Sequence, residues 1–236
     1  MICAANGRVE YTSSESSGWR VLAKSDFERG NVCATNSPLA CVVLHHGVSS
    51  RCSRCFSKSS ALMKCSRCHY VCYCSSLCQK SDWAQHKGEC RFLETVLTRF
   101  RDQEAHFTDI RLLLRVNSAK KSSLASLCST DRDGVVSCGR EHAERMCATT
   151  AASSEDKLLA KFVASLLKLN TIDILVTMLV QFRCNNFGIM DELLQCIGAG
   201  VYPMGALLNH SCRPNCVLRY NFIPGQDVAL QVSLVL

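Results

Sequence analysis

The sequence predicts an α+β fold, either as one medium domain or as a domain with an inserted module. Three patterns lead to this prediction. Short β-type runs lie near both ends of the 236-residue chain, cysteines crowd into residues 51–92, and helical periodicity fills residues 93–115 and 155–195. Because 47% of the residues are hydrophobic, the chain can bury a core, and disorder along its whole length is excluded.

The N-terminal segment is predicted to form short strands. Trp19–Ala23 and Val32–Ala34 are strand-like runs on either side of a turn at Glu28-Arg29-Gly30. Leu39–Leu44 is a further apolar run that ends just before the cysteines. These runs provide the first part of the expected β scaffold.

Residues 51–92 hold four pairs of metal-type ligands. The pairs are Cys52-x2-Cys55, Cys65-x2-Cys68, Cys74-x3-Cys78 and His86-x3-Cys90. A C-x2-C knuckle lets two thiolates reach one tetrahedral ion, and residues four apart on a helix point to the same face. Eight ligands make two closed nitrogen–sulfur sites, which is typical of structural zinc. Cys72 fits no pair and is interpreted as a non-ligand.

The 18 cysteines of the chain also indicate a compartment. The N-terminus lacks a secretory signal pattern, and metal-type spacing favours reduced thiols, so we expect an intracellular protein in the nucleus or the cytoplasm. Cysteines outside the cluster, such as Cys33, Cys41 and Cys196, are expected to be small buried apolar residues. The most apolar run, Leu158–Phe182, contains charged residues, so we expect no membrane span.

Positive charge is concentrated in the same stretch as the cysteines. The chain has a formal charge of +7, and residues 51–92 set eight Lys or Arg against Asp82 and Glu89. Seven thiolates and two Zn²⁺ ions lower the charge of the whole chain to about +4 and that of residues 51–92 to about +3. No basic stripe interleaved with aromatic residues remains elsewhere, so nucleic-acid binding is disfavoured.

Two helical regions follow the cysteines, with a polar stretch between them. Residues 93–115 have apolar side chains at helical spacing, whereas residues 117–155 are rich in Ser, Ala and charge and predict a loop or a loosely ordered insert. Helices resume over residues 155–195. Ser154 is the expected N-cap, and Glu155 and Asp156 follow it in the first turn.

The C-terminal segment returns to β-type sequence. Val217–Tyr220 and Val228–Val235 are predicted to pair as two strands around a turn at Pro224-Gly225-Gln226-Asp227. The run Leu207-Leu208-Asn209-His210-Ser211-Cys212 lies just before this pair. From its chemistry alone, this run is also compatible with a capped turn that contains a hydrogen-bonded His.

The zinc stretch resembles the MYND finger, with matches at Tyr73-Cys74, Cys78-Gln79, Trp83, His86 and Cys90. The resemblance implies cross-braced pairs, so that one zinc takes the first and third pairs and the other takes the second and fourth. The first set is Cys52, Cys55, Cys74 and Cys78, and the second is Cys65, Cys68, His86 and Cys90. The resemblance also implies a surface groove that binds proline-containing peptides of partner proteins.

The run L-L-N-H-S-C-x-P-N-C that begins at Leu207 resembles the signature of SET-domain protein-lysine methyltransferases. With the finger, the chain resembles the SET/MYND family, which implies a partial SET-type β-fold. The implied boundaries are an N-terminal part of the SET domain at 1–50, the finger at 51–92, a helical linker and insert at 93–196, and an incomplete SET core at 197–236.

The same resemblance implies S-adenosylmethionine as a cofactor and a histone or non-histone lysine as methyl acceptor. Asn209 would contact the amino-acid end of the cofactor, His210 its adenine through the backbone, and Asn185 would add a hydrogen bond. Gly18 would belong to the N-terminal cofactor loop, where Arg20 stands in place of a second glycine of the family pattern. Glu155-Asp156-Lys157 resembles another family stretch more weakly.

Two family features are expected beyond Leu236, namely a strand that carries the catalytic Tyr and a cysteine-rich tail. We therefore assign no catalytic residue within the chain and expect no third zinc at Cys212. Tyr202 is considered either as a substitute for the missing hydroxyl or as a packing residue. Three functions remain open: a protein-lysine methyltransferase, an inactive MYND adaptor or truncated fragment, and a nucleic-acid-binding zinc protein.

Overall fold

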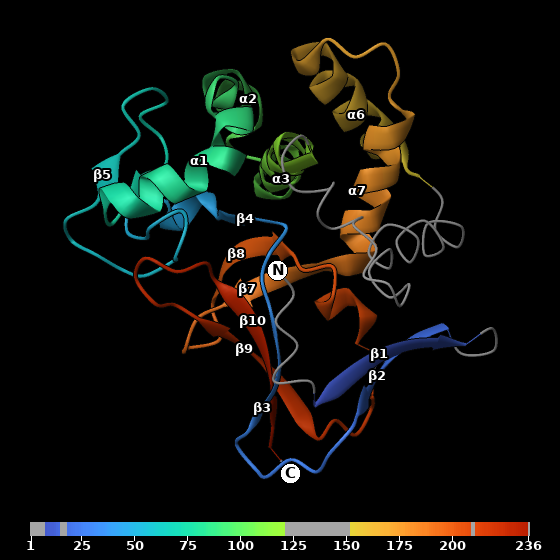
Figure 1. The fold of residues 1–236 in the computed structure, drawn as a ribbon. Coiled ribbons are helices and arrows are strands. Elements are labelled where there is room, and N and C mark those ends of the chain that lie inside the picture. The colour runs from blue at the N-terminus through green and yellow to red at the C-terminus, as the bar shows by residue number, and fades with distance from the viewer. Residues whose placement is uncertain (1–7, 15–17, 121–151, 209–210, 236) are drawn as a thin grey trace.

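The computed structural model describes residues 8–14, 18–120, 152–208 and 211–235. These residues form the expected mixture of helices and small sheets (Figure 1). The strands are β1 Val9–Ser14, β2 Gly18–Ala23, β3 Val32–Asn36, β4 Ala40–Val43, β5 Met63–Lys64, β6 Cys72–Tyr73, β7 Asn186–Met190, β8 Cys196–Val201, β9 Cys216–Asn221 and β10 Ala229–Leu234. The helices are α1 Ser76–Cys90, α2 Leu93–Phe100, α3 Glu104–Lys120, α6 Ser154–Leu167 and α7 Asp173–Asn185, with short 3₁₀ turns η1 His45–Gly47 and η2 Gly205–Leu207.

Both larger sheets combine strands from opposite ends of the chain. Their strand orders are β3-β10-β9 and β4-β8-β7. β3 pairs antiparallel with β10, and β4 pairs antiparallel with β8. The cysteine-rich stretch and the helices thus lie in sequence between strands that are neighbours in space, as Figure 1 shows. The α+β class with an insertion into a β scaffold is confirmed.

The predicted C-terminal strand pair is also confirmed. β9 and β10 are antiparallel, with Asn221 opposite Ala229 and Cys216 opposite Leu234. Within their connection, the amide of Gln226 donates to the carbonyl of Ile223 at 3.0 Å, and Gly225 has a φ of 85°. A positive φ at the third position of a tight turn is readily adopted by glycine, which explains why this residue follows Pro224.

The helix predicted over residues 93–115 is divided in two. α2 ends at Phe100 and α3 begins at Glu104, because the exposed polar residues 101–103 interrupt the apolar pattern. The break lets the Phe100 ring meet the Phe162 ring of α6, with centroids 5.0 Å apart. α3 continues to Lys120, so the first residues of the predicted 117–155 loop are helical, and residues 121–151 lie outside the described residues.

Two predicted boundaries of the second helical region were wrong. The N-cap of α6 is Ser153, not Ser154, because the Ser153 hydroxyl accepts from the Asp156 amide while the Asp156 carboxylate accepts from the Ser153 amide. The helical region ends at Asn185, not at residue 195. Residues 186–190 form β7 because pairing with β8 overrides their local preference.

The cysteines outside the cluster divide between core and surface. Cys33 and Cys41 are buried, as predicted. Cys196 is exposed, which corrects the prediction; it is the first residue of β8, where the pairing with β7 shifts register. Among the described residues, no helix combines the length and the apolar character needed to cross a bilayer.

Candidate metal centre

The first ligand group joins the start of the cysteine-rich stretch to the start of α1. The sulfur atoms of Cys52, Cys55, Cys74 and Cys78 all lie within 4.8 Å of one another. Cys55 Sγ and Cys74 Sγ are 3.6 Å apart, as are Cys74 Sγ and Cys78 Sγ. Ser75 caps α1 by accepting from the Cys78 amide, which fixes Cys78 in the first helical turn beside Cys74.

The second ligand group lies at the other end of α1. Cys65, Cys68, His86 and Cys90 also offer atoms that lie within 4.8 Å of one another. Cys65 Sγ is 3.9 Å from Cys90 Sγ, and Cys68 Sγ is 3.6 Å from His86 Nε2. His86 and Cys90 are four residues apart on α1, so both side chains leave the same face of the helix. The two groups divide the eight residues in the cross-braced manner that the resemblance implies.

The distances fit zinc. A tetrahedral Zn²⁺ with Zn–S bonds of about 2.3 Å places its sulfur ligands about 3.8 Å apart, and a sulfur and an imidazole nitrogen about 3.5 Å apart. The observed separations of 3.6–3.9 Å agree with both values. Thiolate and imidazole donors are those that zinc prefers, and four of them fill each tetrahedron. The module therefore contains two zinc-binding clusters.

Each C-x2-C knuckle closes with a residue in the left-handed region. Phe56 and His69 directly follow the second cysteine of their pairs and have φ values of 59° and 52°. Their amides donate to the carbonyls of Cys52 and Cys65, each at 2.9 Å. This turn folds both cysteines of a pair toward one ion, and the two knuckles use the same local geometry.

A buried carboxylate fixes the orientation of His86. The Glu89 Oε1 atom lies 3.0 Å from His86 Nδ1, and both side chains are almost fully buried. An imidazole that donates its Nδ1 proton to a carboxylate keeps Nε2 unprotonated and free for a metal. Nε2 is the atom that faces Cys68, so the side chain is held in the tautomer and direction that zinc requires.

Two arginines of α3 hold Glu89 in its charged form. Arg111 Nε donates to Glu89 Oε2 and Arg115 Nε to Glu89 Oε1, each at 2.8 Å. Burial alone raises the pKa of Glu89, but the two guanidinium groups outweigh it and hold this pKa well below its usual range. Arg111 also donates to the Val43 carbonyl at the end of β4, at 2.8 Å. The zinc cluster is thereby connected to the scaffold sheet.

Arg115 extends the same network to a second carboxylate of α1. It donates to both oxygens of Asp82, at 2.9 and 3.1 Å. Asp82 in turn accepts from the Tyr73 hydroxyl at 2.7 Å, and burial raises the pKa of Tyr73. Each buried charge thus has a partner of opposite sign and several hydrogen bonds, which is the condition under which buried ions are tolerated.

Sequence reasoning missed this network. Asp82 and Glu89 were used only in the charge count of the basic stretch, and Arg111 and Arg115 were not singled out. A signal exists, since the two carboxylates are seven residues apart and the two arginines four apart, so each pair lies on one helix face. Only the packing of α1 on α3 brings the two faces together.

Two further ion pairs fix the module to the scaffold. Arg51 Nη2 lies 2.8 Å from Asp191 in the turn between β7 and β8, and both side chains are buried. Arg54 Nε lies 3.0 Å from Asp227, which precedes β10. Figure 1 shows the module beside α3, with the scaffold strands below it. Acidic residues from two scaffold connections therefore hold the base of the module.

The described part of the chain does not test whether the predicted cofactor residues come together. Gly18 begins β2, and the Asn185 amide at the end of α7 donates to the Gln181 carbonyl at 2.9 Å. Asn209 and His210 lie outside the described residues. The neighbouring Asn186, which sequence reasoning did not single out, has a buried Oδ1 without a hydrogen-bond partner among the described residues. The assignment of these residues to a cofactor stays a prediction.

Tyr202 packs in the core of the scaffold. It is fully buried, and its hydroxyl donates to the Val228 carbonyl at 2.9 Å. Burial also raises its pKa well above the usual range, so the phenol keeps its proton. Of the two roles considered for Tyr202, these contacts favour packing. Cys72 is buried but belongs to neither ligand group.

Comparison with known proteins agrees with this geometry. Residues 52–90 match the MYND finger family. The chain is 31% identical over 213 residues to histone-lysine N-methyltransferase ASHR1 of Arabidopsis thaliana, an alignment that covers 85% of this chain and 42% of that protein. It is 29% identical over 222 residues to mouse N-lysine methyltransferase SMYD2, covering 93% of this chain and 50% of the relative.

Mouse histone-lysine N-methyltransferase SMYD3 is 27% identical over 215 residues, covering 91% of this chain and 50% of that protein. The chain thus spans about half the length of the curated relatives it matches. The finger with its two ligand groups and this similarity over most of the chain lead to one conclusion: the protein belongs to the SET- and MYND-domain family.

Proposed function

We propose that the cysteine-rich module is a two-zinc protein-binding finger and that all eight predicted residues are its ligands. The observation that supports the proposal is the division of these side chains into two groups of four, with the ligand atoms of each group within 4.8 Å of one another. Four protein donors fill each group, so the zinc ions hold structure rather than activate water. A rigid finger on a scaffold offers a surface on which a partner can dock without ordering the finger first.

Metal analysis tests the ligand assignment. The purified chain should contain about two zinc ions, and Cys74→Ser should contain about one. Cys72→Ser is the matched control, because Cys72 is buried in the same finger but belongs to neither group, and it should keep both ions. One zinc or none in the unaltered chain, or loss of zinc in Cys72→Ser, would contradict the assignment.

The groove for proline-containing peptides is the second part of this proposal. Trp83 on α1 and Met63 on β5 are 42% and 47% exposed, and β5 forms one edge of the two-stranded sheet of the finger. Exposed aromatic and apolar side chains beside a strand edge suit an extended peptide. A proline-rich peptide should change the fluorescence of Trp83, and Trp83→Ala should abolish binding of the peptide. Unchanged affinity of Trp83→Ala for the peptide would contradict the proposed groove.

We further infer that the whole protein transfers a methyl group from S-adenosylmethionine to a lysine of a histone or another protein. The similarity to proteins named lysine methyltransferases and the Asn209-His210 motif support this inference. The cofactor supplies an electrophilic methyl group. The chain would bind and orient it through Gly18, Asn185, Asn209 and His210, and the unpaired buried oxygen of Asn186 offers an acceptor next to Asn185.

Calorimetry with S-adenosylmethionine and transfer of a radiolabelled methyl group to histones test the inference. Asn209→Ala should weaken cofactor binding without loss of zinc. If the zinc-loaded protein binds partner peptides but does not bind the cofactor and transfers no labelled methyl group, it is an inactive MYND adaptor. Reduced thiolate ligands persist in the nucleus and cytoplasm, which are the compartments we propose.

A further inference from the structure

A pocket of about 410 Å³ lies where the finger meets α2. Its lining includes Arg67 and His69 of the second knuckle, Arg91 after α1, and Leu93 and Leu97 of α2. The zinc-ligand residues Cys68 and Cys90 border it as well. This volume suits a few side chains of a peptide. The pocket is separate from the exposed Trp83 and Met63, since neither of these residues lines it.

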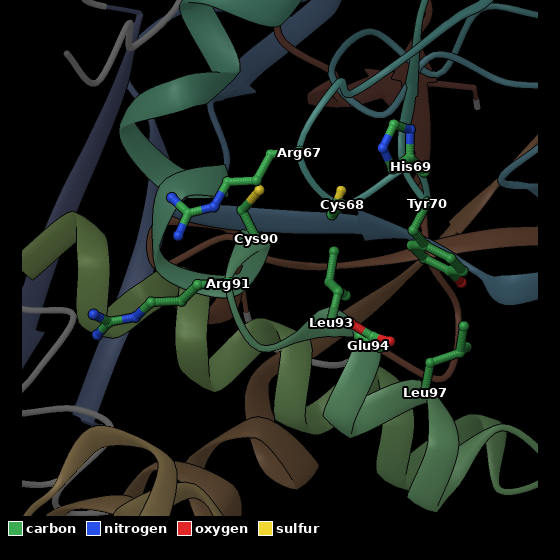
Figure 2. A pocket seen from close by; sticks show the side chains of 9 residues that line it. All are labelled: Arg67, Cys68, His69, Tyr70, Cys90, Arg91, Leu93, Glu94 and Leu97. Carbon is green, nitrogen blue, oxygen red and sulfur yellow. The ribbon is translucent and has the colours of Figure 1, made fainter.

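The walls of the pocket differ in chemistry. Figure 2 shows Arg67 and Arg91 on one side, His69 and Tyr70 on the other, and Leu93 between them. Both arginines are exposed, whereas Leu93 is buried. The pocket therefore has a cationic wall, an aromatic wall and an apolar floor.

The cationic wall is not neutralised from within the finger. Asp82 and Glu89, the acidic residues of 51–92, are buried against the arginines of α3. Within the described part of the chain, Arg67 and Arg91 have no carboxylate partner; Arg91 lies over the Phe92 ring at 4.4 Å. Exposed guanidinium groups of this kind can donate hydrogen bonds to a carboxylate of a ligand.

The total charge around the pocket is small. Glu94 also lines it, and a zinc ion with three thiolates and one histidine carries a net charge of −1. These two negative groups offset the two arginines, so a polyanion such as nucleic acid gains little from the pocket as a whole. A ligand with one carboxylate on the arginine side and an aliphatic group over the floor fits the distribution better.

His69 lines the pocket on the side opposite the arginines. Its imidazole is exposed, and in Figure 2 it faces Arg67 and Arg91 across Leu93. Its φ of 52° belongs to the turn that closes the second knuckle, as the φ of Phe56 does in the first.

We propose that this pocket binds a short segment of a partner protein that carries a carboxylate next to an aliphatic side chain. The carboxylate contacts Arg67 and Arg91, and the aliphatic group covers Leu93 and Leu97. The inference rests on the proposed protein-binding role of the finger, but it places a second contact away from the groove for proline-containing peptides.

Amide chemical shifts of the isotope-labelled, zinc-loaded chain test the proposal. The probe is an acetylated and amidated Gly-Ser-Glu-Leu-Ser-Gly peptide, compared with versions that have Gln for Glu or Ala for Leu. The parent peptide should shift the amides of the pocket, and each replacement should weaken binding. Arg91→Gln should reduce the affinity roughly tenfold, which is the loss of one charge-assisted contact.

Lys80→Gln is the matched control, because Lys80 is exposed on α1 and does not line the pocket. It should bind the peptide like the unaltered chain, and both variants should keep two zinc ions. Equal weakening by the two variants, stronger binding of a single-stranded oligonucleotide, or shifts outside the pocket would overturn the proposal. If a proline-rich peptide binds and the acidic peptide does not, the proposed function of the finger stands and only the proposal for this pocket is contradicted.

Discussion

The finger and the strand scaffold are stabilised in different ways within one chain. The finger strands β5 and β6 have two residues each, and its interior holds ligand thiols and charged side chains beside only a few apolar residues such as Phe56, Val71 and Tyr73. The scaffold has strands of four to six residues that bury Val42, Val43, Ile189 and Leu230. Metal coordination and ion pairs take the place of apolar burial where the apolar residues are few.

Removal of zinc should separate the two regions most clearly. A chelator is expected to unfold the finger, because structural zinc contributes about 10–16 kcal/mol in isolated fingers. Amides of β6 and α1 should lose protection from hydrogen exchange, while those of β9 and β10 keep it. Protection should return when zinc is added back. Simultaneous loss of protection in both regions would show that they form one cooperative unit.

Replacement of Glu89 should have the next largest effect. In Glu89→Gln, Arg111 and Arg115 lose the charge they share, and breaking such a buried pair costs about 3–5 kcal/mol. His86 also loses its orienting carboxylate, so zinc affinity should fall roughly 10–100-fold. Urea unfolding and competition with a chromogenic chelator measure the two effects. Glu94→Gln, which removes an exposed carboxylate, should change neither.

Disturbing the close packing of the finger on the scaffold should have a smaller effect on stability. A Cβ atom on Gly198 of β8 would lie 2.3 Å from Phe56 Cε1 and 2.7 Å from the Val42 carbonyl oxygen. Gly198→Ala should therefore destabilise the chain by about 1–3 kcal/mol in urea unfolding. The control is Gly188→Ala on β7, where a Cβ meets only side-chain atoms at 3.3 Å. Equal stability of the two variants would contradict this packing.

The smallest predicted effect depends on pH. Burial raises the pKa of Asp109 on α3 from its ordinary 3.8 to about 6. The folded state then binds a proton at Asp109 more tightly than the unfolded state, so the contribution of Asp109 to stability is greatest below about pH 4 and is lost as the pH rises through 6. Asp109→Asn should remove this slope and stabilise the chain by about 1–2 kcal/mol at pH 8, after allowance for partial exposure. Asp102→Asn, at an exposed site, should leave the slope unchanged.

Local patterns predicted the finger better than they predicted its attachment. The spacing of Cys52 to Cys90 indicated eight ligands, because knuckles and helical repeats are determined by a few neighbouring residues. Their cross-braced division came from the family resemblance. The pairing of Glu89 with Arg111 and Arg115 was missed, since it depends on how two helices distant in sequence pack against each other.

The same distinction explains the errors at element boundaries. Residues 186–190 continue the apolar sequence of α7, and only the pairing with β8 makes them a strand. The capping residue of α6 was misplaced by one position because Ser153 and Ser154 are both good N-caps, and the choice depends on the reach of the Asp156 carboxylate. For the cofactor residues, the sequence provides a family motif whose geometry the described residues do not test.

The pairing of β3 with β10 and of β4 with β8 has a consequence for the order of folding. On the ribosome, β3 and β4 are synthesised long before their partners, so neither sheet can close until β8 and β10 have been made. The finger needs no such wait, because its ligands all lie within residues 52–90. Zinc can therefore be captured co-translationally, and the finger would become a folded platform before the scaffold that carries it is closed.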